Sequence, residues 1–68
     1  MNRKQLATHL ARALPHTATR VRDAILAIHD GATWRDASIA NGVTESGILK
    51  AMQRAGLKKK RGAGGQPN

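Results

Sequence analysis

Apolar residues recur at spacings of three and four along the first half of this chain, which is the period of an α-helix rather than of a β-strand. Residues 2–14 carry such a stripe at Leu6, Leu10, Ala13 and Leu14. Residues 17–30 carry another at Val21, Ala24, Ile25 and Ile28. Polar residues occupy most of the positions in between. The pattern therefore predicts two amphipathic helices, each burying one face.

Residues that start and stop helices flank both stretches. Asn2 can cap the first helix, and Pro15 ends it because the residue before a proline is disfavoured in the α conformation. Thr17 or Thr19 is expected to cap the second helix, and Gly31 to close it. The polar residues of the second helix lie off its apolar stripe and are expected to form a solvated face: Arg20, Arg22, Asp23 and His29.

A second helical pair is predicted on either side of Gly42. Thr33 is followed three residues later by Asp36, which resembles a capping box at the start of a third helix. Gly42 can adopt the positive φ of a tight corner without a Cβ clash. Thr44 can then cap a fourth helix, expected to span about residues 45–55.

Two short helices joined by such a corner have the layout of a helix-turn-helix. The inward positions are small or aliphatic: Ala37, Ala40, Val43, Ile48 and Met52. The opposite side of the second helix of the pair, which would face a DNA major groove, is polar: Glu45, Ser46, Lys50, Gln53 and Arg54. Trp34 is the single aromatic residue and is expected in the core, with Leu57 folding back onto it. Gly47 is expected to let the two helices pack closely.

The 68 residues are enough for one small domain followed by a tail. Residues 1–57 hold the four helical patterns and are predicted to form an all-α bundle that contains the helix-turn-helix. Residues 58–68 lack apolar periodicity and are rich in glycine, so a disordered basic tail is expected there. A domain of this length buries a modest fraction of its surface, so we expect a partner to stabilise it.

The charge of the chain indicates what that partner is. Twelve Lys and Arg residues stand against four Asp and Glu residues, giving a net charge of +8. Residues 58–61 supply four of the cations without an acid beside them. A polyanion such as nucleic acid is therefore expected to bind, attracted mainly by the N-terminal helices and the tail.

Catalytic and metal-binding patterns find no support. The chain has no cysteine, and His9, His16 and His29 lack the spacing that places two metal ligands on one helix face. The acids are scattered, and Ser38 and Ser46 have no nucleophile context. We expect neither enzyme activity nor a cofactor, metal site or small-molecule ligand. No apolar run approaches the roughly 20 residues of a membrane helix, and a cytoplasmic, nucleoid-associated location in a bacterial cell is expected.

The sequence GVTESGILKAM at residues 42–52 resembles the helix-turn-helix of Cro-type phage repressors and of the KorA/TrfB-type plasmid repressors. The likeness covers about twenty residues, and four of them fall at the small, glycine, aliphatic and β-branched positions of the family: Ser38, Gly42, Val43 and Ile48. Two residues depart from the pattern. Asn41 replaces the usual aliphatic residue before the corner glycine, and Glu45 places a negative charge where a neutral donor is more usual.

The resemblance implies which side chains face DNA. Base-edge contacts are implied for Glu45, Ser46, Leu49 and Lys50. Phosphate contacts are implied for Thr33 and Thr44, close to the two helix starts. Position and charge add further expected phosphate contacts at Arg35, Gln53, Arg54, Lys58, Lys59, Lys60 and Arg61.

These features predict a sequence-specific regulator of double-stranded DNA, a repressor that binds an inverted-repeat operator as a homodimer. Leu6, Leu10 and Leu14 are either the dimer interface or part of the core. Three other functions fit parts of the pattern. They are a recombination or excision accessory protein, a general RNA-binding or ribosome-associated protein, and a protein-interaction module built on the same scaffold.

Overall fold

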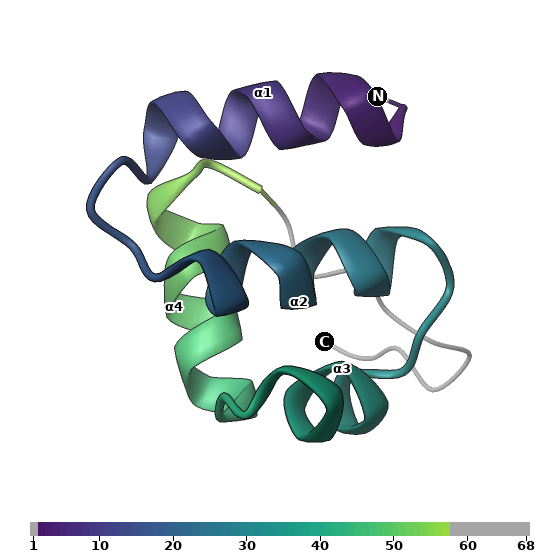
Figure 1. The fold of residues 1–68 in the computed structure, drawn as a ribbon. Coiled ribbons are helices and arrows are strands. Elements are labelled where there is room, and N and C mark those ends of the chain that lie inside the picture. The colour runs from purple at the N-terminus through teal and green to yellow at the C-terminus, as the bar shows by residue number, and fades with distance from the viewer. Residues whose placement is uncertain (1, 58–68) are drawn as a thin grey trace, which may run out of the picture.

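A computed structural model describes residues 2–57, which are all-helical and contain no strand. The predicted basic tail, with the four cations expected to contact phosphate, lies outside the described residues. Four helices follow one another along the chain (Figure 1): α1 Arg3–Ala13, α2 Thr19–His29, α3 Trp34–Asn41 and α4 Glu45–Arg54. The prediction of an all-helical bundle is confirmed for this part of the chain.

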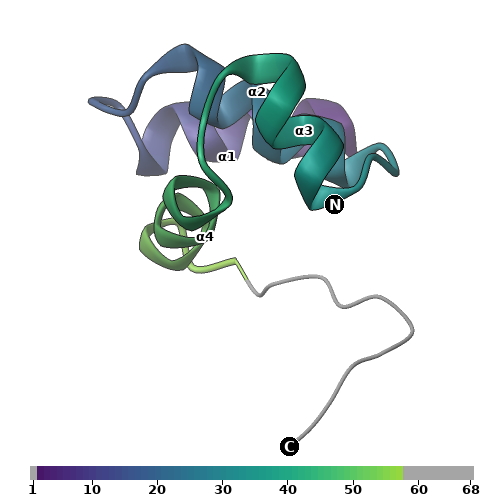
Figure 2. The same ribbon diagram turned by 90° about the horizontal axis from the view of Figure 1, so that it is seen from below.

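Helix α2 lies at the centre of the bundle. It packs against each of the other three helices, and α3 also packs against α4. In Figure 1, α1 and α2 lie one above the other, α3 lies below α2, and α4 crosses them. The view from below shows α4 to one side of the layer that the other three helices form (Figure 2). One face of α4 is therefore turned to the bundle and the other is left outside it.

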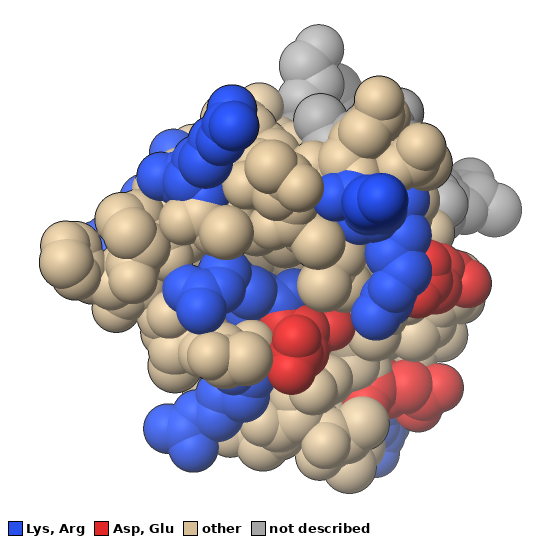
Figure 3. Space-filling view, turned by 45° about the horizontal axis from the view of Figure 1, so that its top comes forward, with Lys and Arg blue, Asp and Glu red and all other residues tan. Residues whose placement is uncertain are grey.

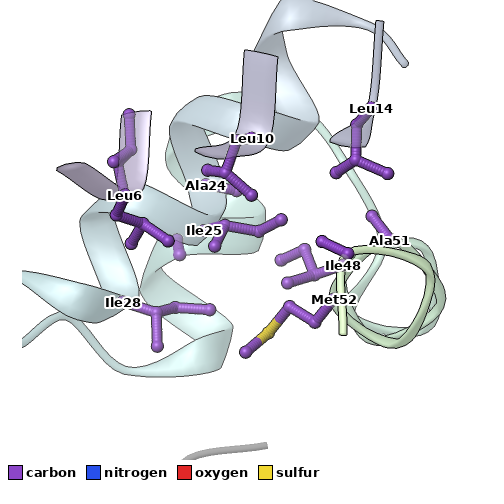
Figure 4. Packing of buried hydrophobic residues seen from close by; sticks show 12 residues of the cluster. Leu6, Leu10, Leu14, Ala24, Ile25, Ile28, Ile48, Ala51 and Met52 are labelled. Atoms are coloured by element: carbon purple, nitrogen blue, oxygen red, sulfur yellow. The ribbon is translucent and has the colours of Figure 1, made fainter. Parts of the chain in front are cut away.

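Apolar side chains of α1, α2 and α4 converge between these helices (Figure 4). The largest fully buried ones are Leu10, Ile25 and Ile48, one from each helix. Leu6 and Leu14 are also buried, so the three leucines of the N-terminal segment belong to the core of the monomer. The alternative that they form a dimer interface is wrong.

Three positions differ from the predicted apolar stripes. Ala13 and Ala40 are exposed, and Leu26 is buried although it was not predicted to be. The buried residues of the N-terminal segment are 6, 10 and 14, and Ala13, the last residue of α1, is left exposed. Helix α3 lies at the surface and buries only Ala37 fully, so Ala40 is left exposed. Leu26 is buried because α2 has neighbours on several sides.

The first helix begins as predicted. The Asn2 side chain accepts a hydrogen bond from the Gln5 backbone N–H at 2.8 Å. The Gln5 side chain in turn accepts from the Asn2 N–H at 3.1 Å, which completes a capping box. The helix ends at Ala13, just before the Leu14-Pro15 pair, as the proline predicts.

The predicted cap of α2 is wrong. Ala18 occupies the cap position and makes no side-chain hydrogen bond, so neither Thr17 nor Thr19 caps the helix. Arg22 stabilises this junction instead, donating to the Leu14 carbonyl at 2.7 Å and to the Thr17 carbonyl at 2.5 Å. Arg22 is half-buried and is therefore not part of a solvated face.

Two other expectations for the core are confirmed. Trp34 is half-buried and packs against the buried cluster. Leu57 folds back after α4, and its backbone N–H donates to the Met52 carbonyl at 2.8 Å. The Leu57 side chain then lies against the same cluster, so the C-terminal end of α4 is held to the core.

Candidate nucleic-acid interface

The corner between α3 and α4 is built from residues 42–44. Gly42 has φ 65° and ψ 35°, a left-handed conformation that a residue with a Cβ adopts only with strain. The Val43 N–H donates to the Ser38 carbonyl at 3.0 Å, and the Ser38 hydroxyl donates to the Val43 carbonyl. Val43 also packs half-buried against the core. The angle between the two helices is therefore fixed by the backbone, by a side chain and by packing.

Thr44 starts α4 as predicted, because its hydroxyl oxygen accepts from the Gly47 backbone N–H at 2.9 Å. Glu45 lies in the first turn, where a negative charge is favourable beside the positive end of the helix dipole. A Cβ at Gly47 would lie 3.1 Å from the Thr44 hydroxyl and within 4 Å of no atom of another helix. The expectation that Gly47 permits close helix packing is wrong, and its small size leaves room for the cap.

Loss of this cap should loosen the start of α4. Thr44→Ala leaves the Gly47 N–H without its partner, and we expect it to lower the free energy of unfolding by about 1 kcal/mol, within a range of roughly 0.5–2 kcal/mol. Thr44→Ser retains the hydroxyl and is the matched control, expected to stay close to wild type. Urea titration followed by circular dichroism measures both. Equal stability of Thr44→Ala and wild type would contradict the role of the cap.

Helix α4 separates its side chains sharply between two faces. The face turned to the bundle is buried: Ile48, Ala51 and Met52, followed by Ala55. The opposite side is exposed, and we call it the α4 outer face: Glu45, Ser46, Lys50, Gln53 and Arg54. Ser46, Lys50 and Gln53 follow one another at i, i+4 and i+7, so they form one row along the helix. This arrangement brings together five of the predicted contact residues.

Leu49, predicted to contact a base, is half-buried at the edge of the α4 outer face. The part of this apolar side chain that stays exposed is suited to contact such as with a thymine methyl and has no hydrogen-bonding capacity. Leu49 therefore differs from the exposed residues Ser46, Lys50 and Gln53, because part of its side chain packs against the protein.

The predicted phosphate contacts of α3 lie apart from this row. Thr33 and Arg35 stand at the N-terminal end of α3, and the corner to α4 follows its C-terminal end. The eight residues of α3 span about 12 Å at the rise of an α-helix. The Thr33 hydroxyl accepts from the Asp36 N–H at 3.0 Å and caps α3, as predicted. Arg35 is exposed and has no ion-pair partner among residues 2–57.

Charge is distributed unevenly over the described residues. Helix α1 contains Arg3, Lys4 and Arg12 and no acid, whereas each of the other three helices contains at least one acid. Figure 3 shows Lys and Arg side chains interspersed with acidic ones over the face that includes α1 and α2. Arg3 pairs with Asp30, which uses one of the α1 cations to tie the start of α1 to the end of α2. On the α4 outer face, Lys50 and Arg54 have no such partner within residues 2–57.

A hollow along α1 was not predicted from the sequence. It has a volume of about 380 Å³ and is lined by Lys4, Gln5, Thr8, His9 and Arg12. The sequence does contain a pattern that corresponds to this hollow, because Lys4, Thr8 and Arg12 recur at every fourth residue opposite the leucine stripe. Polar residues on an amphipathic helix are the ordinary pattern for a solvated side, so the sequence alone does not single out this surface.

His9 also has a specific partner. Its Nε2 atom lies 2.7 Å from the Ala55 carbonyl oxygen at the end of α4. A carbonyl oxygen only accepts hydrogen bonds, so Nε2 carries the hydrogen and donates it. This bond connects the first and last helices of the bundle.

Two other features, a metal site and a membrane-spanning helix, are absent from the described part of the chain. Within residues 2–57, no three acidic or histidine side chains gather closely enough to hold a metal ion. None of the helices found there is both long and apolar enough to cross a membrane.

Comparison with known proteins identifies no relative of this chain. No protein-family model matches the chain, and neither a curated protein nor a solved structure matches it. The likeness of residues 42–52 to phage and plasmid repressors therefore stays a prediction.

Proposed function

We propose that this chain is a sequence-specific binding protein for double-stranded DNA, acting as a transcriptional repressor, with α3 and α4 as its helix-turn-helix. The observation that carries the proposal is the division of α4 into two faces. Ile48 is fully buried on one face, while Ser46, Lys50 and Gln53 form an exposed polar row on the other. A helix presented in this way on a basic chain is suited to enter a major groove.

The chemistry of the row supports base reading. Lys50 can donate to the O6 and N7 acceptors of guanine, and Ser46 can donate to or accept from several base edges. Glu45 can accept from a cytosine amino group, although its place in the first turn of α4 also stabilises the helix by itself. Thr33, Arg35, Thr44, Gln53 and Arg54 are assigned to phosphate contacts, as are the cations at positions 58–61.

Reading a DNA sequence requires suitable side-chain chemistry and also a rigid helix that holds Ser46, Lys50 and Gln53 in place. The bonds between Ser38 and Val43 fix the corner, the Thr44 cap fixes the start of α4, and Leu57 holds its end. A base contact depends on the donor lying within hydrogen-bonding distance of a groove edge, so a helix held at both ends discriminates better than a mobile one.

We propose a homodimer on an inverted repeat, because one helix of ten residues reaches few base pairs. The two copies of α4 would lie about 34 Å apart, one turn of DNA. With Leu6, Leu10 and Leu14 buried in the monomer, the contact between copies must use other residues. A cytoplasmic, nucleoid-associated location follows from the same proposal.

Selection of bound sequences from random duplex DNA tests the function. We expect an enriched inverted repeat with half-sites about one helical turn apart. Enrichment of a single half-site would support base reading and contradict the dimer. Absence of any enriched sequence, together with binding to DNA of all sequences, would contradict the proposed function.

The alternatives give different results in the same assays. A recombination or excision accessory protein would bend DNA that carries several sites without repressing a promoter. A general RNA-binding protein would bind RNA tightly without selecting a duplex sequence, but the chain has one aromatic residue and so no stacking platform. A protein-interaction module would bind no DNA even at low salt.

A further inference from the structure

The hollow along α1 contains two cations that have no ion-pair partner among residues 2–57. Arg3 lies on the same helix but is paired with Asp30. Lys4 and Arg12 line the hollow and have no ion-pair partner among residues 2–57. Helix α1 supplies no acid to offset them. Two cations are therefore available to a ligand at the two ends of this hollow, which we call the α1 groove.

The spacing of these cations suits an extended ligand. Lys4 and Arg12 are eight residues apart, which corresponds to about 12 Å along the helix axis. This separation exceeds the Debye length of about 8 Å at physiological ionic strength, so their mutual repulsion is largely screened. A chain of anionic groups can follow the row of Lys4, Thr8 and Arg12, whereas one small anion would leave most of it unused.

The uncharged groups of the groove are already oriented by the protein. Gln5 uses its side-chain oxygen to accept from the Asn2 N–H, which leaves its NH₂ group to donate elsewhere. The Thr8 hydroxyl donates to the Lys4 carbonyl at 3.1 Å. His9 is held by the Ala55 carbonyl. Its described lining residues offer donors from Lys4, Gln5 and Arg12 and include no carboxylate, so the groove matches a ligand rich in acceptor oxygens.

We propose that this groove, lined by Lys4, Gln5, Thr8, His9 and Arg12, binds the phosphate backbone of the DNA at a second surface besides the α4 outer face. The inference rests on the proposed DNA-binding function and extends it to a helix outside the α3–α4 pair. The His9–Ala55 bond joins the edge of this groove to the C-terminal end of α4, the end that carries Gln53 and Arg54, so the groove and these two residues lie at the same end of the bundle. Contacts there position the protein without reading bases.

The double variant Lys4→Gln/Arg12→Gln tests the groove in the full chain. Glutamine keeps a polar, hydrogen-bonding stem and removes the charge. We measure binding to the selected duplex and to a scrambled duplex between 50 and 200 mM salt. The slope of log K against log salt should become shallower by about 1.8, since each lost phosphate contact contributes about 0.9. Affinity for the two duplexes should fall by the same factor.

Arg20→Gln is the matched control, because Arg20 is an exposed cation on α2 without an ion-pair partner among residues 2–57. We expect its slope to equal that of wild type. An unchanged slope for the double variant would overturn the groove assignment. So would a loss in Arg20→Gln equal to that of each groove substitution, because net charge alone would then explain the effect. Thermal unfolding of all variants checks that each one folds, and the single variants Lys4→Gln and Arg12→Gln replace the double variant if it does not.

Two further results separate the possible outcomes. Inorganic phosphate titrated at constant ionic strength should shift the amide NMR signals of α1 only weakly. Saturable binding of free phosphate, with an unchanged DNA slope, would overturn the assignment to a DNA backbone. Failure of the proposed function is recognised separately, because wild type itself would then show equal affinity for the selected and scrambled duplexes.

Discussion

Replacing Leu10 with alanine is expected to remove most of the stability of this domain. Leu10 is fully buried among side chains of α1, α2 and α4 (Figure 4). Truncation of a buried leucine costs about 2–5 kcal/mol, because transfer energy is lost and a cavity remains. A domain of this size has a total stability of only about 3–8 kcal/mol at 0.05–0.15 kcal/mol per residue. Urea unfolding followed by circular dichroism should show a large fall in the midpoint.

Ile39→Ala is the matched control for this loss. Ile39 is 69% exposed, the one large apolar side chain within residues 2–57 that is so open to solvent. Its truncation should change the free energy of unfolding by less than about 0.5 kcal/mol. A loss below 1 kcal/mol in Leu10→Ala would contradict the packing of α1 on the core.

Protein concentration gives a second check on Leu10. A residue buried within the monomer lowers stability by the same amount at every concentration, whereas a dimer contact makes the midpoint depend on concentration. We expect the difference between wild type and Leu10→Ala to stay constant over a hundredfold range. A difference that grows with protein concentration would restore the leucines as an interface.

Replacing Lys50 with alanine should cost the protein most of its preference for a selected duplex over a scrambled one. Lys50 lies at the centre of the exposed row on α4, between Ser46 and Gln53, and has no ion-pair partner among residues 2–57. A well-placed base contact contributes about 1–3 kcal/mol of discrimination, which corresponds to roughly 5–150-fold in the affinity ratio. Fluorescence anisotropy with both duplexes at one salt concentration measures the ratio.

The control for Lys50 is Arg20→Ala, which removes the same charge from α2. It should leave the affinity ratio unchanged, because Arg20 lies on a different helix from the exposed row. If Lys50→Ala weakens binding to both duplexes equally, Lys50 contacts phosphate and the base-reading role is wrong. The stability of Lys50→Ala should match wild type, since the side chain is exposed.

Local features of the fold were predictable because they depend on residues within one helical turn of each other. Asn2, Thr33 and Thr44 cap the helices that they were expected to cap, each through a backbone N–H three residues later. The positive φ of Gly42 was likewise expected from its place between two helical patterns. Such interactions have the same geometry in any fold, so a sequence pattern is sufficient to predict them.

The α2 junction shows where local reasoning fails. Thr17 and Thr19 have the chemistry of caps, yet Ala18 occupies the position. Arg22 satisfies carbonyls of the preceding loop from inside the helix, at sequence separations of five and eight residues. A guanidinium has five donors and a long reach, so its partners cannot be deduced from spacing along one helix.

The candidate interface was predictable in part for the same reason. The polar row of Ser46, Lys50 and Gln53 follows from helical periodicity and is exposed as expected. The half-burial of Leu49 depends on the packing of α4 against the bundle, and the groove on α1 depends on which cations found acidic partners. Pairing of Arg3 with Asp30 joins residues 27 positions apart.

The sequence by itself determined the four helices, most of their ends and the two faces of α4, because apolar periodicity and capping act over three or four residues. Only the tertiary structure decided that Leu6, Leu10 and Leu14 are core, that Ala40 faces solvent, and that Lys4 and Arg12 line a groove without an ion-pair partner among residues 2–57. These outcomes depend on which surfaces meet when helices distant in sequence pack together, and a periodic pattern is the same whether a face meets its own core or another molecule.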